Sequence, residues 1–116
     1  MAPTPIPPYL ALAFQVPTLP VAGLADREAV RLQIATNIAS IGVALDASAP
    51  HLAESHGLPV RLVVLPEYVL TGAPGGGTFA DWRRLACLEM NGPEYEALAA
   101  IATRGGFFLA GNAYEA

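Results

Sequence analysis

The stretch that most constrains the fold is residues 61–65, RLVVL, where a continuous apolar run stops at a proline. The run is short and rich in β-branched residues, and it does not alternate with polar residues, which is typical of a strand covered on both faces, as in a parallel sheet. Pro66 ends the strand because it has no N–H to donate to the ladder. Glu67 follows directly, at the carboxyl end of the strand, where open α/β sheets bind their ligands.

Apolar runs in residues 9–16 and 107–113 predict two more strands. Asp26 is a good N-cap for a helix. The inward positions of that helix recur every three or four residues and are Val30, Ile34, Ile38, Ile41 and Leu45. The side opposite this stripe is expected to be solvated and carries Arg27, Glu28, Arg31 and Gln33.

Three further helices are predicted. Ser48 and Pro50 indicate the start of a short helix that ends at Gly57, read as a surface insertion. Thr78 begins a helix with a capping-box pattern, and a third helix begins at residues 92–93 and ends at residues 105–106. The order predicts an α/β domain with about three parallel strands and with helices on one face, or on both faces if the strand order reverses.

Composition argues against a membrane-spanning protein and against a nucleic-acid-binding protein. The chain has 116 residues, of which 53% are hydrophobic and 14% charged, yet no apolar stretch reaches membrane-spanning length. This apolar excess indicates a missing packing partner. The net charge of -4 and the scattered arginines argue against nucleic acid as a partner. Residues 1–8 resemble a disordered Pro-rich arm rather than a secretory signal, and a single cysteine fits a reducing cytoplasm.

Several residues could carry chemistry. Glu67, if partly buried, would have its pKa raised toward the range of a general base, although most glutamates at strand ends are solvated or ion-paired. The glycines of residues 75–77 lie in a loop expected at the same edge, but the lysine of a phosphate-binding loop is missing. His51 and His56 are five residues apart and do not form an i, i+4 metal pair. Cys87 is expected to be a small apolar helix residue.

Four blocks resemble one known family. Residues 65–68, LPEY, followed by LTG at residues 70–72, look like the first catalytic motif of the nitrilase, or carbon-nitrogen hydrolase, superfamily. The GPE of residues 92–94 and the FFLAGNAYE of residues 107–115 resemble the helix and strand that follow in that family, and residues 9–15 resemble its opening strand. Within the last block, Asn112 and Tyr114 would project toward the Glu67 edge.

The resemblance implies a fold and a reaction. Residues 9–116 would be the N-terminal half of an αββα sandwich, and Glu67 would be the general base of a Glu-Lys-Cys triad that hydrolyses amides or nitriles without a cofactor. The chain departs from this pattern because it has no lysine, and because Cys87 precedes the GPE block whereas the family nucleophile lies far downstream. No metal is implied. The chain alone is therefore expected to be inactive.

Two function classes remain open. The first is an incomplete carbon-nitrogen hydrolase, either a fragment or one half of a split enzyme whose complementing half carries the lysine and the cysteine. The second is a non-enzymatic α/β module that binds a partner through an exposed sheet. Family members are commonly oligomers, so a homo-oligomer is also possible.

Overall fold

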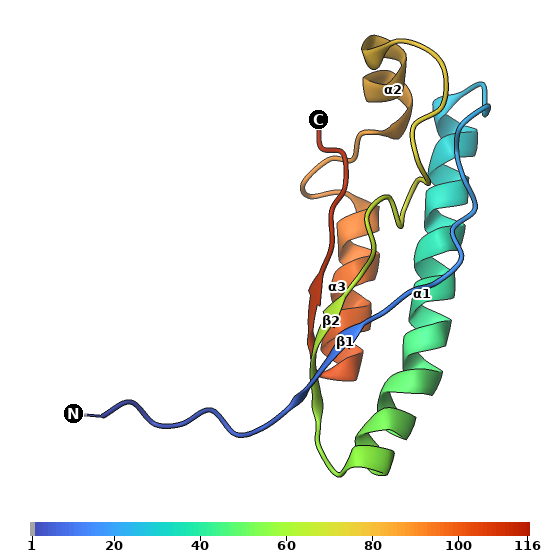
Figure 1. Ribbon diagram of the computed structural model, residues 1–116. Helices are drawn as coiled ribbons and strands as arrows, with labels where there is room; N and C mark the ends of the chain where they lie inside the picture. Colours follow the sequence, from blue (N-terminus) through green and yellow to red (C-terminus); the bar gives the residue numbers. More distant parts are fainter. Residues whose placement is uncertain (1) are drawn as a thin grey trace.

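The computed structural model describes residues 2–116, so Met1 of the predicted arm lies outside it. The chain forms a three-stranded parallel sheet in the order β1-β2-β3, with Leu12, Val63 and Leu109 side by side (Figure 1). The predicted α/β class is thus confirmed in its coarse form, as three parallel strands and three helices. The elements are β1 Leu10–Ala13, α1 Arg27–His56, β2 Val60–Val64, α2 Phe79–Ala86, α3 Pro93–Gly105 and β3 Phe108–Ala110.

Helices α1 and α3 cover one face of the sheet, as expected for right-handed crossovers when the strand order does not reverse (Figure 1). The five predicted inward residues of α1 are all buried to 2% exposure or less. They pack with Val63, which is fully buried, and with Ile101 of α3. The heptad-like apolar spacing of α1 therefore decides which side of the sheet is closed.

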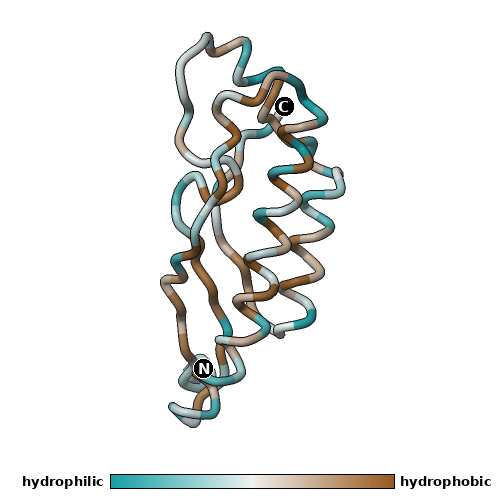
Figure 2. Tube along the Cα trace, turned by 90° about the vertical axis from the view of Figure 1, so that its right-hand side faces the viewer, coloured by the Kyte–Doolittle hydropathy of each residue, from teal (hydrophilic) through white to brown (hydrophobic). Residues whose placement is uncertain are grey.

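The other face of the sheet is open and wholly apolar. The register places six side chains on it, which are Ala11, Ala13, Leu62, Val64, Phe108 and Ala110. Phe108 is 80% exposed and Val64 is 44% exposed. Figure 2 shows the strands on one side of the molecule, with hydrophobic residues along them, and the two long helices on the other. The apolar excess of the sequence is therefore concentrated on a sheet face that the described residues leave uncovered.

Helix α1 is one continuous helix, so the prediction of a separate short helix after Ser48 was wrong. It runs for 30 residues through Pro50 and ends, as predicted, at Gly57, which takes a left-handed φ of 66°. Proline costs a helix one hydrogen bond and a steric clash. Here Leu45 and Ala49 are buried on the sheet side of the same helix, and their packing offsets that cost. The segment is a packed extension of α1 and not a surface insertion.

The predicted solvated side of α1 is confirmed for Glu28 and Arg31, which are exposed, whereas Arg27 and Gln33 are only partly exposed. Both arginines nevertheless bind residues of other helices. Arg27 caps the C-terminal end of α2, donating from Nη1 to the Arg84 carbonyl oxygen at 3.0 Å and from Nη2 to the Cys87 carbonyl oxygen at 2.9 Å. Arg31 donates from Nε to the Glu94 carboxylate at 3.0 Å. These partners are 57 to 63 residues away in sequence, so local periodicity could not reveal them.

The Arg31–Glu94 pair gives a stability prediction. Glu94 is only 6% exposed, whereas Arg31 is 43% exposed. Arg31→Met leaves the buried carboxylate without its charged donor, and we expect it to lower the free energy of unfolding by about 1–2 kcal/mol. Arg104→Met is the matched control, because it removes the exposed Arg104–Asp46 pair and should cost less than about 0.5 kcal/mol. Urea denaturation at submicromolar protein measures both; equal losses would contradict the assignment.

Helix boundaries elsewhere follow the sequence signals. Thr78 and Asp81 form the predicted capping box at the start of α2. Pro93 opens α3, and Gly106 ends it with a φ of 69°. Residues 2–9 carry no secondary structure and extend away from the rest of the molecule (Figure 1). The outer strands are shorter than predicted, since ladder pairing stops while the apolar runs continue.

Candidate active-site edge

Glu67 stands just past the end of β2, the middle strand of the sheet. The Leu65 N–H still pairs with the Ala110 carbonyl oxygen at 2.8 Å, and Pro66 then ends the ladder as predicted. The Glu67 side chain is exposed, and none of the ion pairs found in residues 2–116 involves it. Residues 2–116 therefore leave the Glu67 carboxylate open to water.

Tyr68 takes a left-handed backbone conformation with a φ of 60°, the only non-glycine among the described residues to do so. This conformation is uncommon for a bulky residue and costs on the order of 1–2 kcal/mol. Its carbonyl oxygen accepts the amide of Gly72 at 2.7 Å, and its own amide donates to the Asn112 Oδ1 at 3.3 Å. The strained turn is thus fixed directly after Glu67, and backbone strain of this kind is concentrated at functional sites.

An aromatic cluster stands beside Glu67. The ring of Tyr114 stacks on Tyr68, with 6.2 Å between centroids, and meets the edge of Trp82 at 5.5 Å. Burial raises the pKa of Tyr114, and the neighbouring Tyr68 hydroxyl and Glu67 carboxylate add to this, while the indole N–H of Trp82 acts in the opposite direction. Asn112 and Tyr114 therefore do reach the Glu67 edge, as predicted.

The indole nitrogen of Trp82 is buried and has no hydrogen-bond partner within bonding geometry among the described residues. The backbone of Tyr114 is held in place because its carbonyl oxygen accepts the Leu88 amide at 2.7 Å. The Tyr95 hydroxyl donates to the Glu115 carboxylate at 2.6 Å, which fixes the next residue. The rings of Tyr68, Trp82 and Tyr114 therefore pack together next to the exposed Glu67 carboxylate.

Asn37 of α1 holds the turn at residues 68–72 by hydrogen bonds, and the sequence analysis did not identify it. Its Nδ2 donates to the Leu70 carbonyl oxygen at 2.9 Å and to the Leu19 carbonyl oxygen at 2.9 Å, and its Oδ1 accepts the Leu19 amide at 3.0 Å. Asn37 is 3% exposed. The sequence offers one sign of this role, because Asn37 stands next to Ile38 on the apolar face of a predicted helix. A polar side chain buried there needs hydrogen-bond partners.

The Gly-rich loop lies at the same end of the sheet as Glu67 but packs against the loop after β1 (Figure 1). A side chain on Gly75 would meet the Cβ of Ala22 at 2.9 Å, so the loops touch there. Residues 21–24 and 74–78, with α2, enclose a hollow of about 550 Å³. The loop therefore borders its own hollow next to the aromatic cluster.

The remaining candidate residues lie elsewhere. His51 and His56 are exposed near the C-terminal end of α1, and residues 2–116 contain no cluster of three potential metal ligands. Cys87 caps the C-terminal end of α2 rather than lying within the helix, and it is 6% exposed. Its carbonyl oxygen, not its thiol, has the defined role of accepting from Arg27. No helix in residues 2–116 combines the length and apolarity needed to span a membrane.

Comparisons with family models, with characterised proteins and with solved structures found no match to this chain. The likeness to the carbon-nitrogen hydrolases thus rests on the quoted motifs alone.

Proposed function

We propose that this chain is an incomplete carbon-nitrogen hydrolase domain in which Glu67 is the general base. One observation carries the proposal: the LPEY motif leaves the middle strand of a parallel sheet and presents Glu67 at the carboxyl edge, beside Tyr68, Asn112 and Tyr114. The strained turn at Tyr68 fixes the direction of the backbone there. A carboxylate held at this edge is suited to accept a proton from a group brought to the same edge.

The reaction needs two further groups. A thiol must lose its proton to Glu67 and attack the carbon of the amide or nitrile, and a cation must stabilise the negative charge that develops. Cys87 is buried at the end of α2, and the sequence contains no lysine. Both groups must therefore come from another polypeptide segment, as must the covering that excludes water from Glu67. We place the assembled enzyme in the cytoplasm, where a free thiol persists.

The open sheet face is suited to a partner that contains a second β-sheet. A second sheet packed about 10 Å away would bury the six apolar side chains on that face, as in other two-sheet sandwiches. The arrangement would then have α1 and α3 outside and two sheets inside, which gives three of the four layers of the αββα order implied by the resemblance. A complementing segment that carries the lysine and the thiol on its own sheet would complete the site at the Glu67 edge.

The purified 116-residue chain should not hydrolyse nitriles, aliphatic amides, carbamoyl amines or ω-amides above the rate of a buffer blank. The reason is that a base without a nucleophile and a charge stabiliser cannot run this mechanism. Product release is measured for each substrate class with the parent chain and with Glu67→Gln. Turnover that Glu67→Gln abolishes would show that the chain is self-sufficient and would contradict the proposal.

The same open face also favours a second candidate, a non-enzymatic module that binds a protein partner through its sheet. Unfolding separates the two. A self-sufficient module should unfold in one cooperative transition as a soluble monomer or a defined dimer, because its fold is complete. An incomplete domain should aggregate unless its complement or a polar substitution covers the sheet face. A cooperative, fully soluble parent chain would favour the module.

A further inference from the structure

Asn91 is the only asparagine of the sequence that is followed by a glycine. The other two asparagines, Asn37 and Asn112, are followed by Ile38 and Ala113. Asparagine is chemically labile, and a glycine after it increases this lability, because no Cβ hinders the glycine nitrogen from reaching the carbon of the asparagine side chain. The chain therefore contains one peptide bond that is well suited to an intramolecular reaction.

The structure leaves Asn91 accessible to water. Asn91 is exposed and lies in a turn between the isolated bridge at Leu88 and the start of α3 at Pro93. Its side-chain amide takes part in none of the hydrogen bonds found in residues 2–116, whereas Asn37 and Asn112 both bind the backbone of other segments. The Asn91 side chain is thus free to turn toward its own main chain.

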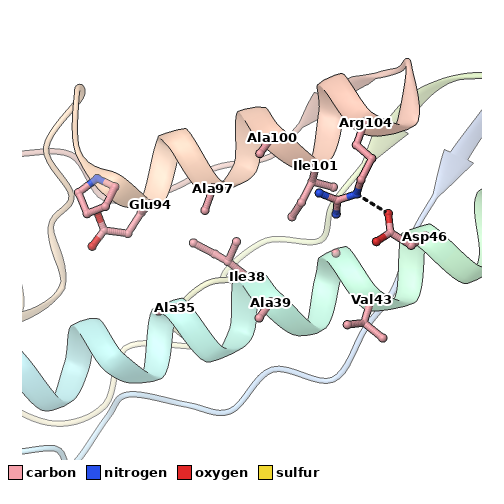
Figure 3. A pocket seen from close by; sticks show the side chains of 12 residues that line it. Ala35, Ile38, Ala39, Val43, Asp46, Glu94, Ala97, Ala100, Ile101 and Arg104 are labelled. Atoms are coloured by element: carbon pink, nitrogen blue, oxygen red, sulfur yellow. Dashed lines mark hydrogen bonds and ion pairs between the residues drawn. The ribbon is translucent and has the colours of Figure 1, made fainter.

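Packing requires the glycine at position 92. A Cβ there would lie 3.0 Å from the Glu89 carbonyl oxygen and 3.0 Å from Oε2 of Glu94. Glu94 is only 6% exposed and binds Arg31 of α1, and Figure 3 shows it at the start of α3. Because Glu94 is held in this way, a larger residue would have to displace its neighbours. The glycine that makes Asn91 reactive is therefore fixed by the packing of α3 on α1.

One hydrogen bond slows the reaction in the folded chain. The Gly92 amide donates to the Glu89 carbonyl oxygen at 2.9 Å, and the nitrogen must leave this bond before it can attack. Asn91 and Glu89 are both exposed, and surface turns of this kind open at little cost in free energy. We therefore expect the folded chain to react more slowly than the unfolded chain, and still to react.

We propose that Asn91 is a site of spontaneous deamidation. The Gly92 nitrogen loses its proton and attacks Cγ of Asn91, the bond from Cγ to Nδ2 breaks, and the side-chain nitrogen leaves with that proton as ammonia. The product is a five-membered succinimide. Water then opens the ring at one of its two carbonyl carbons, which gives aspartate or isoaspartate. The overall change consumes one water molecule and needs no oxidant, metal or enzyme.

Both products add a carboxylate directly before α3. The formal net charge of -4 becomes more negative by one unit. The positive end of the α3 dipole, at Pro93, favours a negative charge at this position. Isoaspartate also lengthens the main chain by one carbon atom between α3 and Leu88, whose amide donates to the Tyr114 carbonyl oxygen at 2.7 Å. The modification therefore alters the connection between α3 and the segment that carries Tyr114.

A single tryptic digest separates the three asparagines. The arginines place Asn37 in residues 32–61, Asn91 in residues 85–104 and Asn112 in residues 105–116. The folded chain is incubated at physiological pH and salt, beside the same chain unfolded in urea. Every protein carries Val64→Glu and Phe108→Glu so that the open sheet face does not associate. A digest at time zero corrects for conversion during digestion.

Mass spectrometry follows the conversion of each asparagine to an acid, and methylation by an isoaspartate methyltransferase detects isoaspartate. Asn91→Gln is the control, because glutamine keeps an exposed amide but forms a cyclic intermediate far more slowly. In the folded chain, Asn91 should convert at least about tenfold faster than Asn112, which is also exposed but precedes an alanine. Isoaspartate should accumulate at Asn91, and Asn91→Gln should abolish the new acidic form of the protein.

Three results would overturn the proposal. The first is an Asn91 that stays intact in the folded chain after the unfolded chain has converted, because the fold would then protect it. The second is equal conversion of Asn91 and Asn112. The third is conversion without isoaspartate, because ring opening of the succinimide is the step that produces this residue.

Discussion

Asn37→Ala is expected to lower the free energy of unfolding by about 2–4 kcal/mol, the largest stability loss we expect from a single polar side chain. The Asn37 amide makes three hydrogen bonds to the backbone of Leu19 and Leu70. Its removal leaves the Leu70 carbonyl oxygen without this partner in a buried setting, and an unsatisfied buried group costs about 1–3 kcal/mol. The same change releases the loop after β1 from the turn that carries Glu67.

Thr36→Ala is the control, since Thr36 is the preceding residue of α1 and its hydroxyl bonds only to its own helix at an exposed position. It should change the free energy of unfolding by less than about 0.5 kcal/mol. Urea denaturation followed by Trp82 fluorescence gives both values, with Val64→Glu and Phe108→Glu present in every protein so that the open sheet face does not associate. If Asn37→Ala lies within about 0.5 kcal/mol of Thr36→Ala, the support assigned to Asn37 is wrong.

The elements that the sequence predicted well are those defined by local patterns. Residues 61–65 were expected as a strand because the run is continuous and ends at Pro66, and β2 is found at Val60–Val64. The apolar residues from Val30 to Leu45 predicted the buried face of α1 correctly. Their spacing of three or four residues is enough to assign them to one side of a helix. Caps at Asp26, Thr78 and Gly106 were readable because each involves neighbouring residues only.

The errors arose where distant parts of the chain override local preference. Pro50 favours a helix start on its own, but burial of Leu45 and Ala49 keeps α1 continuous. Arg31 is exposed as predicted, yet it also binds Glu94 on another helix. Local composition cannot report such pairs, because they exist only once α1 and α3 are packed.

The site itself was predicted in part. Glu67, Asn112 and Tyr114 were placed at one edge, because the carboxyl ends of parallel strands share an edge. The left-handed turn at Tyr68 was not predicted, since glycine or asparagine normally signals that conformation. The buried indole N–H of Trp82 and the support from Asn37 depend on tertiary contacts and lie outside what periodicity can show.

The proposed role of Glu67 as general base predicts the largest effect on activity. In the proposed assembly with a thiol and a cation, Glu67→Gln would remove the proton acceptor while keeping the size of the side chain. General-base catalysis contributes about 10²–10⁴-fold, so kcat should fall by that factor. Glu96→Gln changes an exposed carboxylate in the first turn of α3 and should leave kcat unchanged.

The most direct test is to purify this chain from its native source through a tag on its N-terminal arm, which extends away from the fold (Figure 1). The intact mass of every polypeptide recovered and the hydrolysis of amides and nitriles are then measured together. The account predicts polypeptide beyond the 12.1 kDa described here, with a lysine and a reactive thiol, and hydrolysis that Glu67→Gln reduces by about 10²–10⁴-fold. Full activity in Glu67→Gln, or a recovered assembly that hydrolyses none of these substrates, would contradict it.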